Sequence, residues 1–490
     1  MRDLNKSFKI SNLIVKLWAR EINKLMHDKW KKIVTISIFL LLLIMAGLSG
    51  YQLTKSILDS FLNGDYRSLM LLVISMLINA SIFSYLLYIL FKAVTPEQDR
   101  FDIQIRWFPI RTFEKQIGYY LPFIFAITIL VMFLMLIVLL PAFINKSLSV
   151  SFIVLFFVIV FVQSIFILSI VHGVYHLIYT LLKWFRVPFS KHLTLFLIIL
   201  IGLQYGISTF DINTIIQSYQ DFQYNLFYLA TPLILLALEE VIPMNVNMLL
   251  VVTIISIGLI FPFFAMLFPI KQTDPLQWKF LFSLKIPKGK FASMLMKELK
   301  SQIRNEDNVL MFLMIVVLLV VARFYLNFEN QNYIPFLLAG MTGLTALNSY
   351  GNDMQMFKLY RMYDLKVGTI LFSKLCALWM LAIFQFLVYY MILFGLSGSF
   401  LRFVISLVIL INATMILYLL GTIIPVHKTN PFMGLVAFSI LVLIMIPLLF
   451  LLNQIMVSFS LISKVIFILF IELLLVWGIW SGTRWRLRYD

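Results

Sequence analysis

The chain has 490 residues, of which 62% are hydrophobic and 12% charged, and its formal net charge is +17. Soluble domains are about half apolar and about a quarter charged, so this composition excludes an ordinary soluble protein and indicates one embedded in lipid. No polar domain could present a basic groove, so we expect membrane lipids and no nucleic acid as partners of the positive charge. The single cysteine, Cys376, excludes a disulfide framework.

Apolar runs long enough to cross about 30 Å of hydrocarbon predict twelve membrane spans. They lie near residues 33–53, 69–91, 118–143, 148–182, 193–210, 248–270, 310–328, 334–350, 369–394, 403–424, 433–452 and 465–480. The run 148–182 has no Gly or Pro near its middle, where a hairpin would turn. It therefore predicts one long helix that extends beyond the membrane.

The distribution of basic residues predicts the orientation of these spans. With the N-terminus inside, the inner segments hold 33 of the 39 Lys and Arg residues and the outer segments hold five. Cytoplasmic loops of membrane proteins are enriched in Lys and Arg. We therefore expect both termini to lie in the cytoplasm.

Two features occur twice and predict two halves, residues 1–270 and 271–490. A basic amphipathic segment, expected to lie in the headgroup plane, precedes the first span (13–32) and the seventh (291–308). In the second of these, Met294, Leu295, Leu299 and Ile303 are expected opposite Lys297, Lys300 and Arg304. Similar loops follow the second and eighth spans, RWFPIR and RMYDLK. The first comprises Arg106, Trp107, Phe108, Pro109, Ile110 and Arg111, and the second Arg361, Met362, Tyr363, Asp364, Leu365 and Lys366.

This order predicts an all-α polytopic membrane protein with two pseudo-repeated halves of six helices, each preceded by an interfacial elbow helix. The alternative is that the chain has no repeat, because basic amphipathic flanks occur in many membrane proteins.

The sequence carries no motif for catalysis or nucleotide binding. It lacks the G-x-x-x-x-G-K-[ST] phosphate loop, so we expect no ATP site of that kind in this chain. His172 and His176 have the spacing of two metal ligands on a helix, but no carboxylate or cysteine lies near them in the sequence. We favour a structural role for both. We predict no catalytic, cofactor-binding or metal-binding residue, and the chain alone is not expected to be an enzyme.

Charged and polar positions near the membrane mark other candidate sites. Glu472 lies near the middle of the last span, and Arg323 lies deep in the seventh, where an unpaired charge is costly. The two either pair or line a pathway, or Arg323 reaches the outer interface. In the outer segment 211–247, residues 232–243 (PLILLALEEVIP) are too few to span. They are expected to form a re-entrant or interfacial helix, or a loop that covers the bundle.

The order of elements resembles the ABC-2 type exporter permeases, the transmembrane subunits of bacterial ABC transporters. Residues 18–22 (WAREI) and 296–300 (MKELK) are similar to the elbow helices of that family. The two loops are similar to its short aromatic, Pro, aliphatic, basic segment after the second span. The second loop departs from that pattern, because Asp364 stands where the first has Pro109.

The resemblance implies an ATP-driven exporter in the bacterial plasma membrane that moves an amphipathic or hydrophobic substrate, such as a peptide, a lipid or a drug, outward. It implies two copies of a cytoplasmic ATPase subunit as partners, with ATP and Mg²⁺ bound there and no cofactor in this chain. The loop residues would then be the ATPase-coupling residues, with Trp107, Phe108 and Tyr363 as anchors in a partner's pocket. The helix-start signal at 95–98 (TPEQ) predicts a short rigid lever over residues 97–116.

Two other functional classes stay open. A secondary transporter is expected to have several buried carboxylates and broken helices at mid-membrane, whereas only Glu472 stands out here. A membrane-embedded enzyme or immunity protein is the other class, and a hydrolase of that kind needs clustered His, Glu or Asp residues, which the sequence lacks. The sequence therefore favours the exporter permease.

Overall fold

The computed structural model describes residues 2–25, 66–94, 110–145, 150–187, 189–209, 225–236, 248–270, 287–326, 365–395, 400–424 and 472–484, and parts of 40–51 and 342–363. The described residues fall into two compact units, unit 1 up to residue 270 and unit 2 from residue 287. Every regular element among them is a helix. The chain is therefore an all-α protein, as the composition predicts.

Six helices in the described part of the chain are long and apolar enough to cross a membrane. These stretches are Val73–Ala93, Thr112–Asn145, Val150–Trp184, Met248–Ala265, Val367–Phe394 and Phe403–Ile423. They mark a helical membrane protein, and each overlaps a predicted span. The predicted spans near 33–53, 334–350 and 433–452 lie wholly or largely outside the described residues, and the span near 465–480 is described from residue 472.

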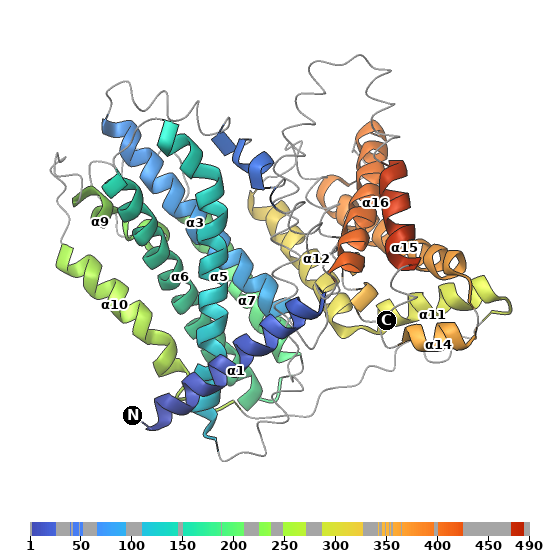
Figure 1. The fold of residues 1–490 in the computed structure, drawn as a ribbon, viewed down its shortest axis with the longest axis horizontal. Helices are drawn as coiled ribbons and strands as arrows, with labels where there is room; N and C mark the ends of the chain where they lie inside the picture. The colour runs from blue at the N-terminus through green and yellow to red at the C-terminus, as the bar shows by residue number, and fades with distance from the viewer. Residues whose placement is uncertain are drawn as a thin grey trace. The chain divides into compact units, whose positions relative to one another are not determined.

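Unit 1 is a layer of long apolar helices with an amphipathic helix across it. Its elements are α1 (Arg2–Leu25), α3 (Tyr66–Val94), α5 (Thr112–Asn145), α6 (Val150–Trp184), α7 (Ser190–Thr209), η1 (Leu226–Tyr228), α9 (Thr231–Leu236) and α10 (Met248–Ala265). The helices α3, α5, α6 and α10 run side by side, and α1 crosses α5 near its first residues (Figure 1). The helix α6 is one continuous helix of 35 residues, as predicted for the run 148–182.

Close contact between α6 and α10 depends on a glycine in each helix. The ring of Phe261 on α10 covers Gly173 on α6, and the ring of Phe166 on α6 covers Gly258 on α10. Neither glycine leaves room for a Cβ. The two helices therefore approach closely at these glycines, in the manner of small-residue contacts in membranes.

The segment 225–236 packs into unit 1 between α3 and α6. The side-chain amide of Gln163 donates to Ser81 Oγ (3.0 Å) and to the carbonyl of Leu226 (2.8 Å), and it accepts from Ala230 N (3.2 Å). Ser81 also donates to the carbonyl of Phe227 (2.7 Å). Ser81 and Gln163 lie inside the candidate spans of α3 and α6, so this segment enters the bundle rather than lying on its rim. Of the predicted segment 232–243, residues 232–236 belong to α9, and residues 237–243 lie outside the described part.

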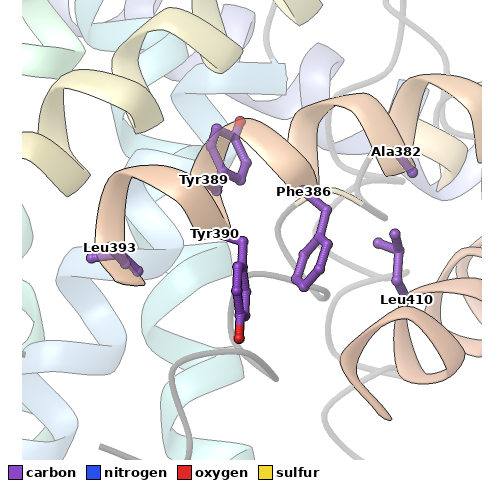
Figure 2. Close-up of a cluster of buried hydrophobic side chains, with 6 residues drawn as sticks. All are labelled: Ala382, Phe386, Tyr389, Tyr390, Leu393 and Leu410. Atoms are coloured by element: carbon purple, nitrogen blue, oxygen red, sulfur yellow. The ribbon is translucent and has the colours of Figure 1, made fainter. Parts of the chain in front are cut away.

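Unit 2 contains α11 (Lys290–Arg304), α12 (Glu306–Leu326), α14 (Phe357–Met362), α15 (Val367–Phe394), α16 (Phe400–Ile423) and helical residues 472–484. Its apolar core runs along α15. Figure 2 shows Ala382, Phe386, Tyr389, Tyr390 and Leu393 on α15, with Leu410 of α16 facing Phe386. Half-buried residues of α12, including Phe312 and Leu319, pack against the same cluster.

Three predicted helix boundaries are wrong. The first helix begins at Arg2 and not at residue 13, because Ser7, Ile10 and Ile14 form one buried stripe that continues toward the N-terminus. The predicted helix 291–308 is divided at Asn305, where the backbone is extended and the Asn308 side chain donates to the carbonyl of Gln302 (3.2 Å). The lever predicted over 97–116 is not one helix, because residues 110 and 111 are non-helical and α5 begins at Thr112.

Candidate functional site

The second predicted coupling loop contains the short helix α14 and presents a large apolar tip. Met362 and Tyr363 are 80% and 72% exposed, whereas Tyr360, one turn earlier, is buried. The helix ends in a turn in which Leu365 N–H donates to the carbonyl of Tyr360 (3.1 Å). Leu365 and Tyr360 pack with Met294 of α11. The base of this loop is thus fixed while its tip is open.

An ion cluster holds that base to α11 and α15. We define it as Lys297, Glu298, Asp353, Tyr360 and Lys374 (α11 and α14 in Figure 1). Lys297 Nζ lies 2.9 Å from Glu298 Oε1 and 3.0 Å from Asp353 Oδ2. Lys374 Nζ lies 2.6 Å from the same Asp353 Oδ2 and 4.0 Å from Glu298 Oε2. Two ammonium groups therefore share one carboxylate oxygen.

The hydroxyl of Tyr360 brings α14 into this cluster. It accepts a short hydrogen bond from Lys297 Nζ. It also lies 3.3 Å from Glu298 Oε1 and 3.4 Å from Asp353 Oδ2, and it can donate to only one of these at a time. The ring of Tyr360 lies under Lys297, with 5.1 Å between Nζ and the ring centroid.

Burial makes the balance of charge in the cluster important. Lys374 and Glu298 expose 1% and 2% of their side chains, Asp353 exposes 7% and Lys297 28%. Burial by itself raises the pKa of Asp353, but the ammonium groups of Lys374 and Lys297 outweigh this and lower it below its usual value. Burial raises the pKa of Glu298, and the Asp353 carboxylate adds to this, although the ammonium groups of Lys374 and Lys297 act in the other direction. The four charges sum to zero, as buried charges must nearly do.

The helix α11 does not have the orientation that its sequence pattern predicts. Its buried stripe is Met294, Glu298 and Gln302, spaced four residues apart, together with Lys300. Leu295, Leu299 and Ile303 are half-buried, and Lys297 points into the ion cluster instead of toward headgroups. The amphipathic helix is confirmed for α11, but the expected outward position of its basic residues is wrong for Lys297, which lies in the ion cluster, and for Lys300, which is buried. The physical reason is that Asp353 and Lys374 provide partners for a polar face on the inside.

The first predicted coupling loop is described only at its end. Ile110 packs against Ile10 and Ile14 of α1, and Arg111 is exposed immediately before α5. The backbone N–H of Arg111 donates to Glu114 Oε2 (3.1 Å), which caps the start of α5. Arg106, Trp107, Phe108 and Pro109 lie outside the described residues.

The other predicted coupling residues of the second loop are Arg361, Asp364 and Lys366. Arg361 belongs to α14, but its side chain lies outside the described part, as does Asp364. Lys366 is exposed and forms the N-cap of α15. Ile110 and Leu365 hold the same place in the RWFPIR and RMYDLK patterns, and each packs against the amphipathic helix of its own unit.

The two predicted intramembrane charges have separate partners. An Nη1 hydrogen of Arg323 is donated to the carbonyl of Ile392, in the last turn of α15. A cation near the C-terminal carbonyls of a helix is favourable. Glu472 Oε1 accepts from Asn412 Nδ2 of α16 at 3.4 Å. No ion pair between Arg323 and Glu472 occurs among the described contacts.

The two histidines of α6 lie in a hydrogen-bonded part of unit 1. The Nδ1 atom of His172 is 3.0 Å from the hydroxyl of Tyr88, and Nε2 of His176 is 3.1 Å from the carbonyl of Phe268. The ring of Tyr120 packs on His172, and its hydroxyl is 2.9 Å from Ser169 Oγ. Within the described residues, no group of three His, Cys, Asp or Glu side chains is arranged to hold a metal ion.

The ion cluster is the feature that sequence reasoning missed. A signal was available, because Lys374 lies five residues inside the predicted span 369–394, where a lysine needs a partner. Glu298 also shares one helical face with Met294 and Gln302. The partner Asp353 follows the predicted span 334–350, where the sequence predicts a loop and gives no signal of burial, whereas the structure has Asp353 helical and buried.

Comparison with protein-family models, with curated proteins and with solved structures finds no match for this chain.

Proposed function

We propose that this chain is the transmembrane permease of an ATP-driven exporter of the ABC-2 type, coupled to two copies of a separate cytoplasmic ATPase. In this proposal twelve spans form two six-helix halves in the plasma membrane, and both termini are cytoplasmic. The pathway carries an amphipathic or hydrophobic molecule outward. The observation that carries the proposal is the tip of α14, where Met362 and Tyr363 are exposed on a firmly held base.

The properties of this tip are those expected of a docking element. A hot spot in a protein interface is a large aromatic or apolar side chain that fills a partner's pocket. Tyr363 provides such a side chain, and Leu359, 43% exposed, extends the apolar face. The exposed Lys366 follows, at the rim. The basic composition of the inner segments supports a cytoplasmic position for this loop.

The packing of the two amphipathic helices, α1 and α11, supports two equivalent halves. In each unit, the amphipathic helix packs against the apolar helix that follows the predicted coupling loop, α1 against α5 and α11 against α15. Ile110 and Leu365 make the corresponding contacts from the two loops. A permease with two such halves would seat one ATPase on each loop.

The proposal is tested by a crosslink from the tip. A photoreactive amino acid at Tyr363, in the full chain in native membranes, should crosslink to a protein that mass spectrometry identifies as carrying a phosphate-loop ATPase domain. Met362→Ala with Tyr363→Ala should weaken copurification of that ATPase, because an interface anchor contributes about 2 kcal/mol or more. Crosslinks to lipid alone would contradict docking and support interfacial anchoring of the loop.

A matched control and the isolated chain complete this test. Trp477→Ala removes another exposed aromatic side chain, 69% exposed, and should leave the ATPase bound. The purified chain without its partner should neither bind nor hydrolyse ATP. Saturable ATP binding by the chain alone would exclude the proposal that ATP binds only to the separate ATPase.

The topology has its own test. In a Cys376→Ser background, a cysteine at Asn145, which is exposed at the end of α5, should react with an impermeant reagent added to intact cells. A cysteine at the exposed Gly289 should react only after the cells are opened. Labelling of position 289 from outside would exclude the proposed orientation.

A further inference from the structure

The ion cluster joins the docking tip to a membrane-spanning helix. It includes residues from α11, from α14 and from α15, together with Asp353 from the helical stretch before α14. The helix α14 has six residues, far fewer than the about 12–15 that an isolated helix needs for marginal stability. Its conformation must therefore depend on contacts with its neighbours.

The contacts of α14 with its neighbours are apolar on one side and ionic on the other. Met294, Tyr360, Leu365 and Ile370 form the apolar contacts. The ionic contacts connect to Lys374, which lies seven residues into α15 and thus about 10 Å along its axis. Apolar contacts are non-directional. By contrast, Lys374 Nζ lies 2.6 Å from Asp353 Oδ2 where the lysine side chain is 1% exposed, so moving either group away would leave a buried charge without its partner.

We propose that the Asp353–Lys374 pair is a rigid link that makes the tip of α14 and the span α15 move as one body. The pair is a positioning element and touches no substrate. The inference rests on the proposed function only for its purpose, which is to pass a displacement of the tip into the membrane. Lys297, which is partly exposed, joins α11 to Asp353 and also donates to the Tyr360 hydroxyl. The direct contact between α14 and the Asp353–Lys374 pair is that of the Tyr360 hydroxyl with Asp353 Oδ2, at 3.4 Å.

The link can be tested in the chain alone. Spin labels at Tyr363→Cys, in the tip, and at Met391→Cys, exposed near the far end of α15, are introduced into the full Cys376→Ser chain in lipid nanodiscs. Double electron–electron resonance should give one narrow distance distribution. Lys374→Met with Glu298→Gln removes one positive and one negative charge and cuts the link. This variant should broaden the distribution by at least twofold.

The matched control removes equal charge elsewhere in the cluster. Lys297→Met with Glu298→Gln leaves Lys374 on Asp353 and should keep the narrow distribution. Lys290→Met, at an exposed lysine of α11, should also leave it narrow. A narrow distribution in the Lys374→Met, Glu298→Gln variant would overturn the proposal, as would equal broadening in both charge-balanced variants. Each variant removes opposite charges together, so neither leaves a net charge in the core.

The outcome separates this inference from the proposed function. If the link is found but no ATPase crosslinks to Tyr363, the rigid link stands and docking fails. If an ATPase docks but both charge-balanced variants stay narrow, docking stands and the link fails. With the ATPase present, the Lys374→Met, Glu298→Gln variant should retain it at normal yield and lose the stimulation of its ATP hydrolysis. Normal stimulation in that variant would also overturn the proposal.

Discussion

In each unit an amphipathic helix packs against a long apolar helix, α1 against α5 and α11 against α15, but the side chains at the two contacts differ in chemistry. In unit 1, Ile10 and Ile14 of α1 pack against Tyr119 and Ile110, and one ion pair joins Lys6 to Glu114 at 3.5 Å. Lys6 is half exposed in that pair. In unit 2, a neutral cluster of four charges, three of them buried and Lys297 partly exposed, lies beside the apolar contacts of Met294. The two contacts are thus apolar and ionic versions of one arrangement.

The difference matters for how each contact responds to force and to solvent. An apolar stripe is non-directional, so its free energy changes gradually as the helices slide. Buried ion pairs depend on geometry, and the loss of one partner leaves a charge without compensation. We therefore expect α11 and α15 to keep a fixed register, and α1 and α5 to tolerate small shifts.

The largest expected effect comes from removing a single buried cation. Lys374→Met should destabilise the folded chain by about 3–5 kcal/mol, because Asp353 and Glu298 would share only Lys297. Lys6→Met removes the half-exposed partner of the buried Glu114, which keeps the Arg111 N–H as a donor, and should cost less, about 1–2 kcal/mol. Apparent melting temperatures from fluorescence-detected size-exclusion chromatography would measure both. Equal losses would show that the two contacts do not differ in kind.

Lowering the pH far enough should remove the stabilisation that the Asp353–Lys374 pair contributes. Pairing lowers the pKa of Asp353, so its stabilisation is complete above the pKa of an unfolded aspartate, about 3.9. It is lost only as the pH falls through the lower folded value. Asp353→Asn should therefore cost about 1.5–3 kcal/mol at neutral pH. The difference in melting temperature from the unmodified chain should persist at pH 5 and shrink below pH 4.

Glu298 should show the opposite trend. Burial raises the pKa of Glu298, so the folded chain gains stability from this group at low pH and loses it as the pH rises through the folded value. We compare the melting temperatures of Glu298→Gln and of the unmodified chain from pH 8 to pH 5. As the pH falls, the melting temperature of the unmodified chain should rise relative to that of the variant. A shift in the other direction would mean that Lys297 and Lys374 control Glu298 as they control Asp353.

A smaller effect is expected where α1 crosses α5. A Cβ at Gly118 would lie 2.7 Å from Ile10 Cγ2, so Gly118→Ala must displace α1. Overpacking costs about 1–3 kcal/mol, and alanine returns up to about 1 kcal/mol of helix propensity. The matched change Gly368→Ala, in the first turn of α15, places a Cβ 3.4 Å from the Trp480 ring and should be neutral. Thermal melting and limited proteolysis of α1 would distinguish the two variants.

The smallest expected effect concerns the cap of α5. Glu114→Ala removes the acceptor for the Arg111 N–H and should cost about 1 kcal/mol. Glu114→Gln keeps an acceptor oxygen and should cost less, even though it ends the ion pair with Lys6. If Glu114→Gln melted at as low a temperature as Glu114→Ala, the ion pair of Glu114 with Lys6 would contribute more stability than its hydrogen bond from the Arg111 N–H.

Periodicity and hydropathy predicted the elements better than their contacts. The apolar runs near 69–91, 118–143, 148–182, 369–394 and 403–424 each overlap a long described helix, because some 20 apolar residues can satisfy their backbone only as a helix in lipid. The amphipathic pattern likewise predicted α1 and α11. It did not predict where α1 begins, because the decisive residues, Ser7 and Ile10, are buried only against α5.

The sequence by itself determined that this is an all-helical membrane protein, since composition and the length of apolar runs leave the backbone no other means of hydrogen bonding in lipid. It also identified Tyr363 as a candidate anchor. Only the tertiary structure decided that α11 turns its polar face inward. That choice depends on Asp353 and Lys374, which lie more than fifty residues away in the chain and become its partners only when unit 2 is folded. A residue pattern records which side chains are polar, whereas burial depends on what the fold places against them.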